Sequence, residues 1–500
     1  MKWMPRGVAF LVGAASLVQE VLWMRLAGLA SGGLPEVFGI VLALYLFGMA
    51  IGAQLGRRLC RNEVGAIRYC GAMILFLSAL FDVLAPFLFA WSISFLPVML
   101  AVAPLVILTA ALKSVMFPIV HHLGSNDAMS WKGISFSRVY FANVLGCTMG
   151  PLLVTLWAMD LWSMEQLFAG VAVVTAAAAG LLMGRWYALA GMGGGAVIGV
   201  MLVPYLPGLA GRVVEATGGT PVAWLLERKE GVIHTIDDPL GDIVFGGNVY
   251  DGRINIDLRR NSNRIDRVYA AMISSPSPKK VLVIGLSGGS WTRVIASFPT
   301  VQQVDVIEIN PGYLELIARY SEVAPILSDP RVHIYIDDGR RWLRMREAYR
   351  YDAIIVNSTF HWRSGATTLL SREFFHLLSR HLTDSGIALI NATGSPEVLK
   401  TVKAEFAHAY QFGNSVIMSQ QDFRAVLRAG AEAIYRTRLD GRIVFDARRK
   451  EDAEAVRRVV EGDLRGLDVV EREVGRSAEI NTDLRMLTEY KYGASSMLKK

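Results

Sequence analysis

The sequence predicts a multi-pass α-helical membrane domain followed by a soluble α/β domain with a doubly wound, largely parallel sheet. Three observations support this fold class. The chain of 500 residues is 53% hydrophobic and only 19% charged. Its charges are unevenly spread, since residues 1–210 carry 11 of the 51 Lys and Arg residues and 7 of the 44 Asp and Glu residues. Beyond about residue 276, short strand patterns alternate with helical patterns.

Seven apolar segments in the first part are each close to the ~20 residues that a helix needs to cross a bilayer. They are 8–30, 37–56, 66–90, 94–120, 136–158, 164–184 and 187–206. The basic N-terminus resembles the start of a signal peptide, but no convincing cleavage site follows, so we expect a retained first membrane helix. Gly48, Gly52 and Gly56 recur at a spacing of four in the second segment, which predicts a close helix-packing face.

Four charged residues lie in or near these apolar segments, namely Glu20, Arg25, Asp82 and Lys113. Charges in such surroundings are costly, and they are usually paired or functional. Glu20 and Arg25 are expected to form a structural pair near a membrane face. A substrate or proton path through the helices is the alternative.

Basic residues in the loops predict the orientation of the helices. One set of loops carries all of the following: Lys2, Arg6, Arg57, Arg58, Arg61, Arg68, Lys132, Arg138 and Arg185. The opposite loops, near 31–36, 91–93 and 159–165, have no Lys or Arg, so the N-terminus is expected to be cytoplasmic. Seven crossings would then place the soluble domain outside. We expect instead that the Gly-rich segment 187–206 does not fully cross and that the soluble domain is cytoplasmic.

Composition excludes several other classes of protein. The net charge of +7 is spread over both parts of the chain, and neither part is basic enough to predict nucleic-acid binding. A weakly basic balance suits an anionic bilayer surface. Cys60, Cys70 and Cys147 all lie in the apolar part and indicate neither a disulfide framework nor a metal site. We therefore expect a multi-pass protein of the inner (plasma) membrane, and we leave a homodimer open.

The soluble part is expected to begin with a small antiparallel β layer and to continue as a nucleoside-binding domain. The expected boundaries are 1–206 for the membrane domain, 207–229 for a linker, 230–275 for the β layer, 276–440 for the α/β domain and 441–500 for a C-terminal helical extension. The strand patterns of the α/β domain are KKVLVIGL, QQVDVIEI, VHIYID and YDAIIV. In the extension, KEDAEAVRRVVEGDL predicts a solvated helix.

Three loops that follow these strands carry the residues of a predicted nucleoside site. The first contains Gly285, Ser287 and Gly289, where glycine lets the backbone approach a ligand. Glu308 ends the second strand and can accept hydrogen bonds from ribose hydroxyls. The third loop, Asp337-Asp338-Gly339, offers a carboxylate for an adenine amino group. Acids without a loop lysine disfavour a pyrophosphate and favour a nucleoside that carries a cation.

These motifs resemble the spermidine synthase (polyamine aminopropyltransferase) family. The resemblance rests on VLVIGLSGG, DVIEINP, DPRVHIYIDDGRRWL, YDAIIVNS and LLSREFF. In the apolar part, LVQEVLWMRLAG and ANVLGCTMGP are similar to the membrane-fused bacterial branch of that family, as is INTDLRMLTEY near the C-terminus.

The resemblance implies a Rossmann-like domain of the class I methyltransferase type, preceded by a β layer. It also implies decarboxylated S-adenosylmethionine as cofactor, or S-adenosylmethionine itself in divergent members, with methylthioadenosine as a product. By the same resemblance Glu308 would hold the ribose and Asp338 the adenine amino group. Tyr269 matches the tyrosine of the acceptor-binding Asp-Glu-x-x-Tyr-His-Glu stretch, and Asp251 matches an Asp-Gly pair before the active site.

This chain departs from the family at the acceptor side. Ala270 and Ala271 stand where the stretch has His and Glu, and Asn357 follows YDAIIV where the family has an Asp that helps deprotonate the attacking amine. An amide has no basic lone pair near neutral pH and can only orient a group. General-base help is commonly worth about 10²–10⁴-fold in rate, so ordinary spermidine synthesis is not expected.

Neighbouring residues could replace the missing acid. His361 lies four positions after Asn357, and neutral imidazole is a suitable base. Trp362 is expected against a sulfonium or ammonium group, and Arg363 against a carboxylate or phosphate of the acceptor. Further candidates for the base are Tyr250, Asp251 and Asp337.

The function expected from the sequence is a membrane-anchored transferase that uses an adenosylmethionine-type sulfonium. It would alkylate a lipid, a membrane protein or a small amine with an aminopropyl or related group. A methyltransferase and a sulfonium lyase or cyclase are alternatives on the same site. A different class is a non-catalytic module that binds a nucleoside or polyamine and is coupled to a membrane transporter or sensor.

Overall fold

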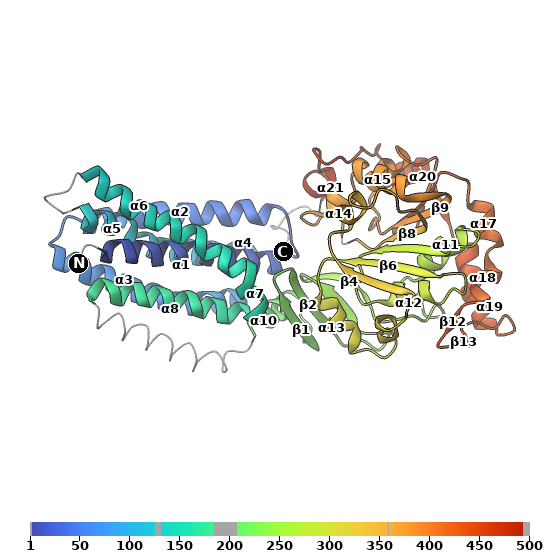
Figure 1. Ribbon diagram of the computed structural model, residues 1–500, viewed down its shortest axis with the longest axis horizontal. Helices are drawn as coiled ribbons and strands as arrows, with labels where there is room; N and C mark the ends of the chain where they lie inside the picture. The colour runs from blue at the N-terminus through green and yellow to red at the C-terminus, as the bar shows by residue number, and fades with distance from the viewer. Residues whose placement is uncertain (1–2, 126–131, 185–207, 359, 494–500) are drawn as a thin grey trace. The chain divides into compact units, whose positions relative to one another are not determined.

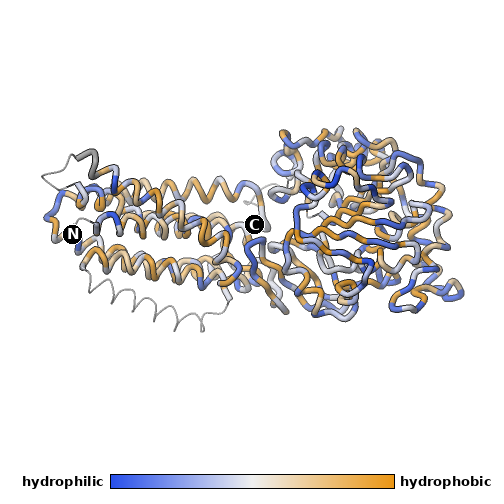
Figure 2. The backbone as a smooth tube through the Cα atoms, in the orientation of Figure 1, coloured by the Kyte–Doolittle hydropathy of each residue, from blue (hydrophilic) through white to orange (hydrophobic). Residues whose placement is uncertain are grey.

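The computed structural model describes residues 3–125, 132–184, 208–358 and 360–493. The chain forms two compact units that divide between Val232 and Ile233. The first unit consists mainly of apolar helices, and the second alternates apolar and polar segments (Figure 2). The predicted fold class, a helical membrane domain followed by an α/β domain with a small antiparallel sheet, is confirmed.

The first unit is built on long helices (Figure 1). Its elements are α1 (Met4–Ala30), α2 (Glu36–Leu59), α3 (Val64–Ser92), α4 (Val98–Ser114), α5 (Met116–Ser125), α6 (Lys132–Leu153), the π-helical turn η1 (Val154–Ala158), α7 (Met159–Leu161), α8 (Met164–Met183), α10 (Leu209–Gly218) and strand β1 (Trp224–Arg228). Among the described residues, six helical spans are long and apolar enough to cross a membrane, with Val98–Ser125 and Phe136–Leu161 each counted as one. They correspond to the first six predicted segments. The expected seventh, 187–206, lies outside the described residues.

The glycine stripe of α2 packs as predicted. A Cβ atom at Gly48 would collide with the carbonyl oxygen of Ile107, and at Gly52 and Gly56 with those of Ala111 and Val115. Because glycine has no side chain, the backbones of these two segments can approach each other closely.

The helices enclose a polar cluster around a buried ion pair. Lys113 and Asp82 are both fully buried, and the Lys113 ammonium contacts the Asp82 carboxylate. Gln19 Nε2 donates to the same carboxylate at 2.6 Å, and Thr175 Oγ1 donates at 3.0 Å. The Lys113 ammonium also donates to Gln19 Oε1 at 3.0 Å. Each charge therefore has an opposite charge and further hydrogen bonds, which offset the cost of removing both from water.

The predicted pair of Glu20 and Arg25 is not formed between the described residues. Arg25 instead donates to the backbone carbonyl oxygens of Arg228 and of Lys229, the latter at 3.0 Å. The prediction was wrong because the partner lies about 200 residues away in sequence. Five positions along a helix also place two side chains on different faces rather than next to each other.

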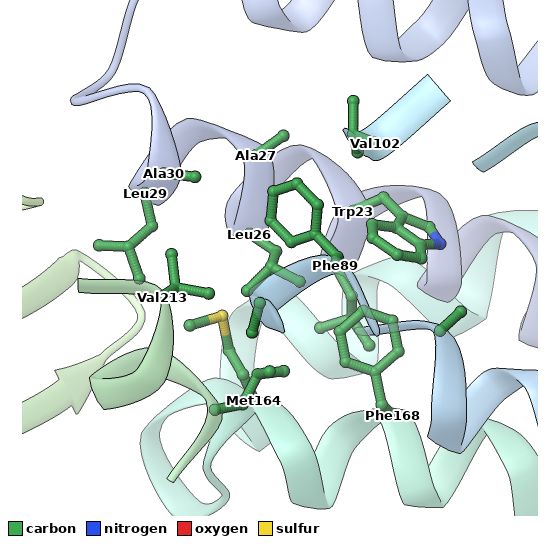
Figure 3. Packing of buried hydrophobic residues seen from close by; sticks show 14 of the residues in the cluster. Trp23, Leu26, Ala27, Leu29, Ala30, Phe89, Val102, Met164, Phe168 and Val213 are labelled. Atoms are coloured by element: carbon green, nitrogen blue, oxygen red, sulfur yellow. The ribbon is translucent and has the colours of Figure 1, made fainter. Parts of the chain in front are cut away.

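The two ends of this unit are packed by different clusters. Leu182, at the end of α8, packs in one cluster with Val8 near the start of α1 and Ile67 near the start of α3. Leu209 and Val213 of α10 belong to the same cluster as Trp23, at the other end of α1, and Figure 3 shows Val213 beside Leu29. Trp23 also contacts Phe89 and Phe168, with ring centroids 6.0 and 5.6 Å apart. Residues 184 and 208 therefore lie at opposite ends of the bundle.

The second unit is built around an eight-stranded sheet. Its strand order is β14-β10-β11-β9-β8-β5-β6-β7. The strands are β5 (Lys280–Ile284), β6 (Gln303–Glu308), β7 (Val332–Ile336), β8 (Tyr351–Val356), β9 (Leu382–Ile390), β10 (His408–Phe412), β11 (Ser415–Ser419) and β14 (Leu464–Arg465). The five neighbouring strands β9, β8, β5, β6 and β7 are parallel to one another. The pairs β9–β11, β11–β10 and β10–β14 are antiparallel. Runs such as VLVI in β5 and AIIV in β8 are buried on both faces, as a covered parallel sheet requires.

Helices and short strands surround this sheet. The helices are α11 (Asp266–Ser274), α12 (Ser290–Ala296), α13 (Gly312–Ala318), α14 (Gly339–Arg344), α15 (Arg372–His381), α16 (Pro396–Lys403), α17 (Arg424–Ala429), α18 (Ala431–Tyr435), α19 (Lys450–Val460), α20 (Leu467–Val474) and α21 (Leu487–Tyr490). Strands β2 (Gly231–Ile236), β3 (Ile243–Gly246) and β4 (Val249–Arg253) form the antiparallel layer, and β12 (Arg438–Leu439) pairs with β13 (Arg442–Ile443).

The C-terminal extension is more than a solvated helix. The predicted helix forms as α19, but Ala455, Val456 and Val459 are buried on one face. Asp452 of the same helix accepts from Arg259 Nε at 2.5 Å. The sequence conceals this face because charged residues interrupt its apolar stripe.

Candidate functional site

A cavity of about 100 Å³ lies at the carboxyl ends of β5 and β8. It is lined by Tyr250, Asp251, Gly252, Asn263, Arg267, Leu286, Ser287, Gly288, Gly289, Ser290, Trp291, Asn357, Ser358, Phe360, Asn391, Thr393 and Asn414. β5 is flanked by β6 on one side and β8 on the other, and the chain order reverses at this point. Ligands of open α/β sheets bind in such a crevice.

The loop after β5 borders the cavity and is held in a restricted conformation. Gly285 has a φ of +90°, and a Cβ atom there would collide with the carbonyl oxygen of Asn357. Ser287 has a φ of +49°, which is unusual for a residue other than glycine. Its hydroxyl donates to the backbone carbonyl of Asp251 at 3.0 Å and so ties the loop to β4. The predicted cofactor residues Gly285, Ser287 and Gly289 are therefore brought together.

Glu308 lies at the end of β6, next to this loop. Its Oε2 accepts from the Leu286 N–H at 2.7 Å, and its Oε1 accepts from the Asn310 N–H at 2.8 Å. Burial raises the pKa of Glu308 to about 7, although these backbone hydrogen bonds oppose the shift. The carboxylate is therefore close to its ionisation midpoint at neutral pH.

The loop after β7 lies at the same edge of the sheet, but its two acids, Asp337 and Asp338, bond to Arg341 of α14. The Asp337 N–H donates to the Glu308 carbonyl at 3.1 Å, so the two loops are neighbours. Asp338 accepts from the Arg341 N–H at 2.7 Å and caps α14, and Asp337 pairs with Arg341 at 2.9 Å. Gly339 packs against the Ile284 side chain, where a Cβ atom would collide.

Glu308 and Asp338 do not line one common cavity. Asp338 borders a separate groove with Arg340, Arg344 and Asp483, whereas Glu308 is buried behind the first loop. The assignment of Asp338 to an adenine amino group stays a prediction, and it would need the cap of α14 to be released.

Asp251 is held inside the cavity by residues from other elements. Tyr313 donates its hydroxyl to Asp251 Oδ2 at 2.6 Å. Burial raises the pKa of the Asp251 carboxyl, and the nearby Arg363 guanidinium opposes that shift. Arg363 also donates to the Gly246 carbonyl at 2.9 Å, at the turn between β3 and β4. Tyr250 lines the same cavity.

Asn357 reaches the cavity, and His361 lies just behind it. The Asn357 side-chain amide makes no hydrogen bond to another described residue, although its backbone N–H donates to Ile284 at 2.8 Å. His361 Nδ1 lies 2.6 Å from Thr393 Oγ1, and the His361 backbone N–H donates to the same oxygen at 3.2 Å. Burial lowers the pKa of His361, so its ring is neutral near pH 7.

Two predicted acceptor residues do not reach the cavity. Tyr269 is 0% exposed and packs between Phe298 and Phe445 in the core, because α11 turns this face inward. It cannot contact an acceptor in the cavity. Trp362 packs at a tilt against Phe360, with ring centroids 5.7 Å apart, and only Phe360 belongs to the lining.

The sequence analysis missed several residues of the site. Two of them, Asn391 and Thr393, follow the end of β9. A third, Asn414, lies in the turn between β10 and β11. Thr393 has a φ of +46°, which is strained for a β-branched residue. The sequence NATGSPEV after the strand GIALI was a usable signal, because the carboxyl ends of parallel strands share one edge. Arg267 was also overlooked.

The C-terminal tail supports the loop that follows Asn357. Glu489 accepts from the Gly365 N–H at 3.1 Å and from the Thr367 N–H at 2.8 Å. Asn481 Nδ2 donates to the Leu370 carbonyl at 3.1 Å. The motif INTDLRMLTEY therefore positions a loop next to the cavity from more than 100 residues away.

The fold and cavity define the soluble unit as an α/β domain with a cavity at the switch point of its sheet, where open α/β sheets bind ligands. A family model described as the spermine/spermidine synthase domain matches residues 268–420. The soluble unit therefore contains a spermidine-synthase-like domain, and the curated proteins that it resembles are aminopropyltransferases.

Two curated relatives show the extent of this similarity. The polyamine aminopropyltransferase of Alkaliphilus oremlandii is 36% identical over 126 residues, which are 25% of this chain and 43% of the relative. Spermidine synthase 2 of Datura stramonium is 33% identical over 146 residues, 29% of this chain and 46% of the relative. The chain thus spans less than half the length of these relatives. A solved spermidine synthase in complex with the transition state analogue AdoDATO is 17% identical, with a TM-score of 0.41, over 51% of this chain and 88% of that one.

We predict that nucleoside binding releases a proton from Glu308. If ribose hydroxyls donate to the ionised carboxylate, as the family resemblance implies, binding favours that form and lowers the pKa of Glu308 from about 7. Affinity for methylthioadenosine should consequently fall as the pH drops from about 8 to 6. Titration calorimetry at pH 7 in two buffers of different ionisation enthalpy should show release of up to about half a proton per site. Glu308→Gln should abolish this buffer dependence and weaken binding about tenfold.

The matched control is Asp384→Asn, which removes an exposed acid on β9 away from the cavity. It should retain both the affinity and the proton release. Binding by Glu308→Gln that equals the wild type at every pH would contradict the role of Glu308.

Proposed function

We propose that this chain is a membrane-anchored transferase that uses S-adenosylmethionine or its decarboxylated form to alkylate a membrane-associated or amine acceptor. The observation that carries the proposal is the glycine loop 285–289, packed on Glu308 and opening onto the cavity. This arrangement lies within the segment 268–420 that matches the spermine/spermidine synthase domain.

The residues at the cavity fit such a cofactor. Gly285 leaves no room for a side chain beside Asn357, and the backbone amides of Leu286 and Asn310 hold Glu308 at the loop. Gly285, Ser287 and Glu308 would hold the nucleoside and its methionine-derived part. The bound cofactor would supply an electrophilic carbon next to a sulfonium leaving group.

The acceptor side supports a reaction other than ordinary spermidine synthesis. Ala270 and Ala271 are buried in α11, and Asp251 is the one carboxylate among the residues that line the cavity. A diamine needs carboxylates for both of its ammonium ends, so a single acid already engaged by Tyr313 is a poor match. Asparagine amides supply most of the remaining polar surface.

Thr393 and His361 offer a route for the proton that the acceptor loses. Thr393 lines the cavity, and its hydroxyl oxygen lies 2.6 Å from His361 Nδ1. As an acceptor N–H or O–H attacks the electrophilic carbon, Thr393 takes up its proton and passes its own hydroxyl proton to His361. Asn357 orients the attacking group through its free amide.

A product assay tests the reaction class. The purified full-length chain in detergent is incubated with S-adenosylmethionine or its decarboxylated form and with membrane lipids or small amines, followed by mass spectrometry. We expect methylthioadenosine together with an alkylated acceptor. Adenosylhomocysteine would show methyl transfer, and methylthioadenosine without an alkylated acceptor would show a lyase or cyclase. Unchanged ligand that nevertheless binds would overturn catalysis in favour of a binding module.

Replacing the proposed base should slow the reaction. His361→Ala is expected to lower kcat by about 10²–10⁴-fold, and Thr393→Val should have a similar effect. Because burial lowers the pKa of His361, the fall of the wild-type kcat with decreasing pH should occur below the range of an ordinary imidazole, as the ring becomes protonated. His376→Ala removes an exposed histidine on α15 and serves as the control. A folded His361→Ala variant with the wild-type kcat and pH profile would exclude this base.

The sequence predicted a cytoplasmic soluble unit. The packing of the helices instead favours a soluble unit on the opposite side of the membrane. The start of α1 and the basic residue Arg68 lie at the end of the bundle where Leu182 packs, whereas α10 and β1 lie at the other end. If the basic loops are cytoplasmic, the soluble unit continues outside.

Cysteine labelling tests this orientation. With Cys60, Cys70 and Cys147 replaced by serine, single cysteines are placed at the exposed positions Asn62 and Ser385. An impermeant maleimide added to intact cells should label Ser385→Cys, and it should label Asn62→Cys only after permeabilisation. The reverse pattern would show that the soluble unit is cytoplasmic.

A further inference from the structure

Arg267 is a buried cation whose side chain reaches the cavity. It lies on α11, is only 7% exposed and stacks over the Trp291 ring, with its guanidinium carbon 4.7 Å from the ring centroid. Both residues belong to the cavity lining. α11 is otherwise buried in the core, so the position of Arg267 is fixed by the packing of its neighbours.

The hydrogen-bond partners of Arg267 are all neutral. Its Nε donates to the Arg264 carbonyl at 3.0 Å. Its Nη1 donates to the side-chain oxygens of Asn391 at 3.3 Å and Ser415 at 3.0 Å, and it also contacts the amide oxygen of Asn414. Nη2 makes no hydrogen bond to any described residue.

No carboxylate among the described residues forms an ion pair with Arg267. The adjacent Asp266 acts on the Arg267 guanidinium through space without forming an ion pair with it, and its Oδ1 lies 3.8 Å from Arg264 Nε. Arg293, which is equally buried, contrasts with this because it pairs with Asp440 at 2.6 Å. Burial lowers the pKa of Arg267 to about 10, which still leaves the guanidinium protonated at neutral pH. A buried guanidinium that forms no ion pair is costly, and it is expected where a ligand supplies the partner.

The other residues that line the cavity do not neutralise the charge of Arg267. Asn263, Asn391 and Asn414 are amides, and the carboxylate of Asp251 is engaged by Tyr313. A diammonium ligand would meet an arginine here and be repelled. A carboxylate would meet an unused Nη2 donor in a dry, aromatic-backed position, where guanidinium–carboxylate hydrogen bonds are strong.

We propose that Arg267 binds a carboxylate group of the ligand that occupies this cavity. The carboxylate is either that of the amino-acid end of intact S-adenosylmethionine or one carried by the acceptor. This inference deepens the proposed function, because it names the chemistry that the site selects. It is tested by binding alone and so does not require turnover.

Titration calorimetry on the full-length chain in detergent distinguishes the two sources. The nucleoside probes are S-adenosylmethionine, its decarboxylated form and methylthioadenosine. The acceptor probes, added with methylthioadenosine, are 4-aminobutyrate and 1,4-diaminobutane, which differ in a carboxylate against an ammonium group. The variants are Arg267→Met and Arg267→Lys, and Arg293→Met is the control for loss of a buried arginine outside the cavity.

If the cofactor carries the carboxylate, the wild type should bind S-adenosylmethionine at least about tenfold tighter than its decarboxylated form. Arg267→Met should remove that preference and leave methylthioadenosine binding unchanged, with Arg267→Lys intermediate. If the acceptor carries it, the two sulfonium forms should bind equally, and 4-aminobutyrate should bind the wild type but not Arg267→Met. The Arg293→Met control should behave as the wild type in both series.

Two results would overturn the inference. One is an Arg267→Met variant, folded by thermal unfolding, that binds every probe as the wild type does. The other is a wild type that prefers 1,4-diaminobutane to 4-aminobutyrate and shows no preference between the sulfonium forms. A wild type that fails to bind methylthioadenosine would contradict the nucleoside site, yet S-adenosylmethionine and 4-aminobutyrate, each titrated against the wild type and Arg267→Met, would still decide the role of Arg267.

Discussion

The close approach of Gly285 to the carbonyl of Asn357 is the constraint on which the soluble site depends. It joins the ends of β5 and β8 at the place where the strand order reverses. Any side chain at position 285 would separate these two ends. The loop that follows Gly285 could then no longer receive Glu308 through the Leu286 amide or hold Asp251 through Ser287. One missing Cβ atom thus sets the positions of both acids beside the cavity.

Local pattern was enough to predict the elements of this fold. Runs such as VLVI and AIIV are buried over their whole length, and the apolar helices repeat at bilayer length, so length and periodicity identified them. The loops at the strand ends followed from the same reasoning, because parallel strands place their carboxyl ends together. This is why Gly285, Glu308 and Asn357 could be assigned to one edge of the sheet.

The parts of the site that sequence did not predict depend on contacts between distant segments. Thr393 follows β9, which pairs with β8, whereas Asn414 lies in the turn between β10 and β11, which reach β8 only through β9. Tyr269 matched a family motif, but the rotation of α11 turned it into the core and turned Arg267 toward the cavity. A shift of two positions along a helix moves a side chain by roughly half a turn, and no one-dimensional pattern reports which face meets the ligand.

Two buried cations in this chain, Lys113 and Arg267, both carry the cost of removing a charge from water. Their surroundings nevertheless indicate different roles. Lys113 lies among apolar helices, but Asp82, Gln19 and Ser78 satisfy its ammonium group. That cluster is complete, so it is best explained as a structural link between helices rather than as a path for protons or substrate. Arg267 is buried to a similar degree but has only neutral partners and one unused nitrogen. The Lys113 ammonium has an ion-pair partner among the described residues, whereas the Arg267 guanidinium has none. We therefore expect a ligand in the cavity beside Arg267 to supply the missing partner.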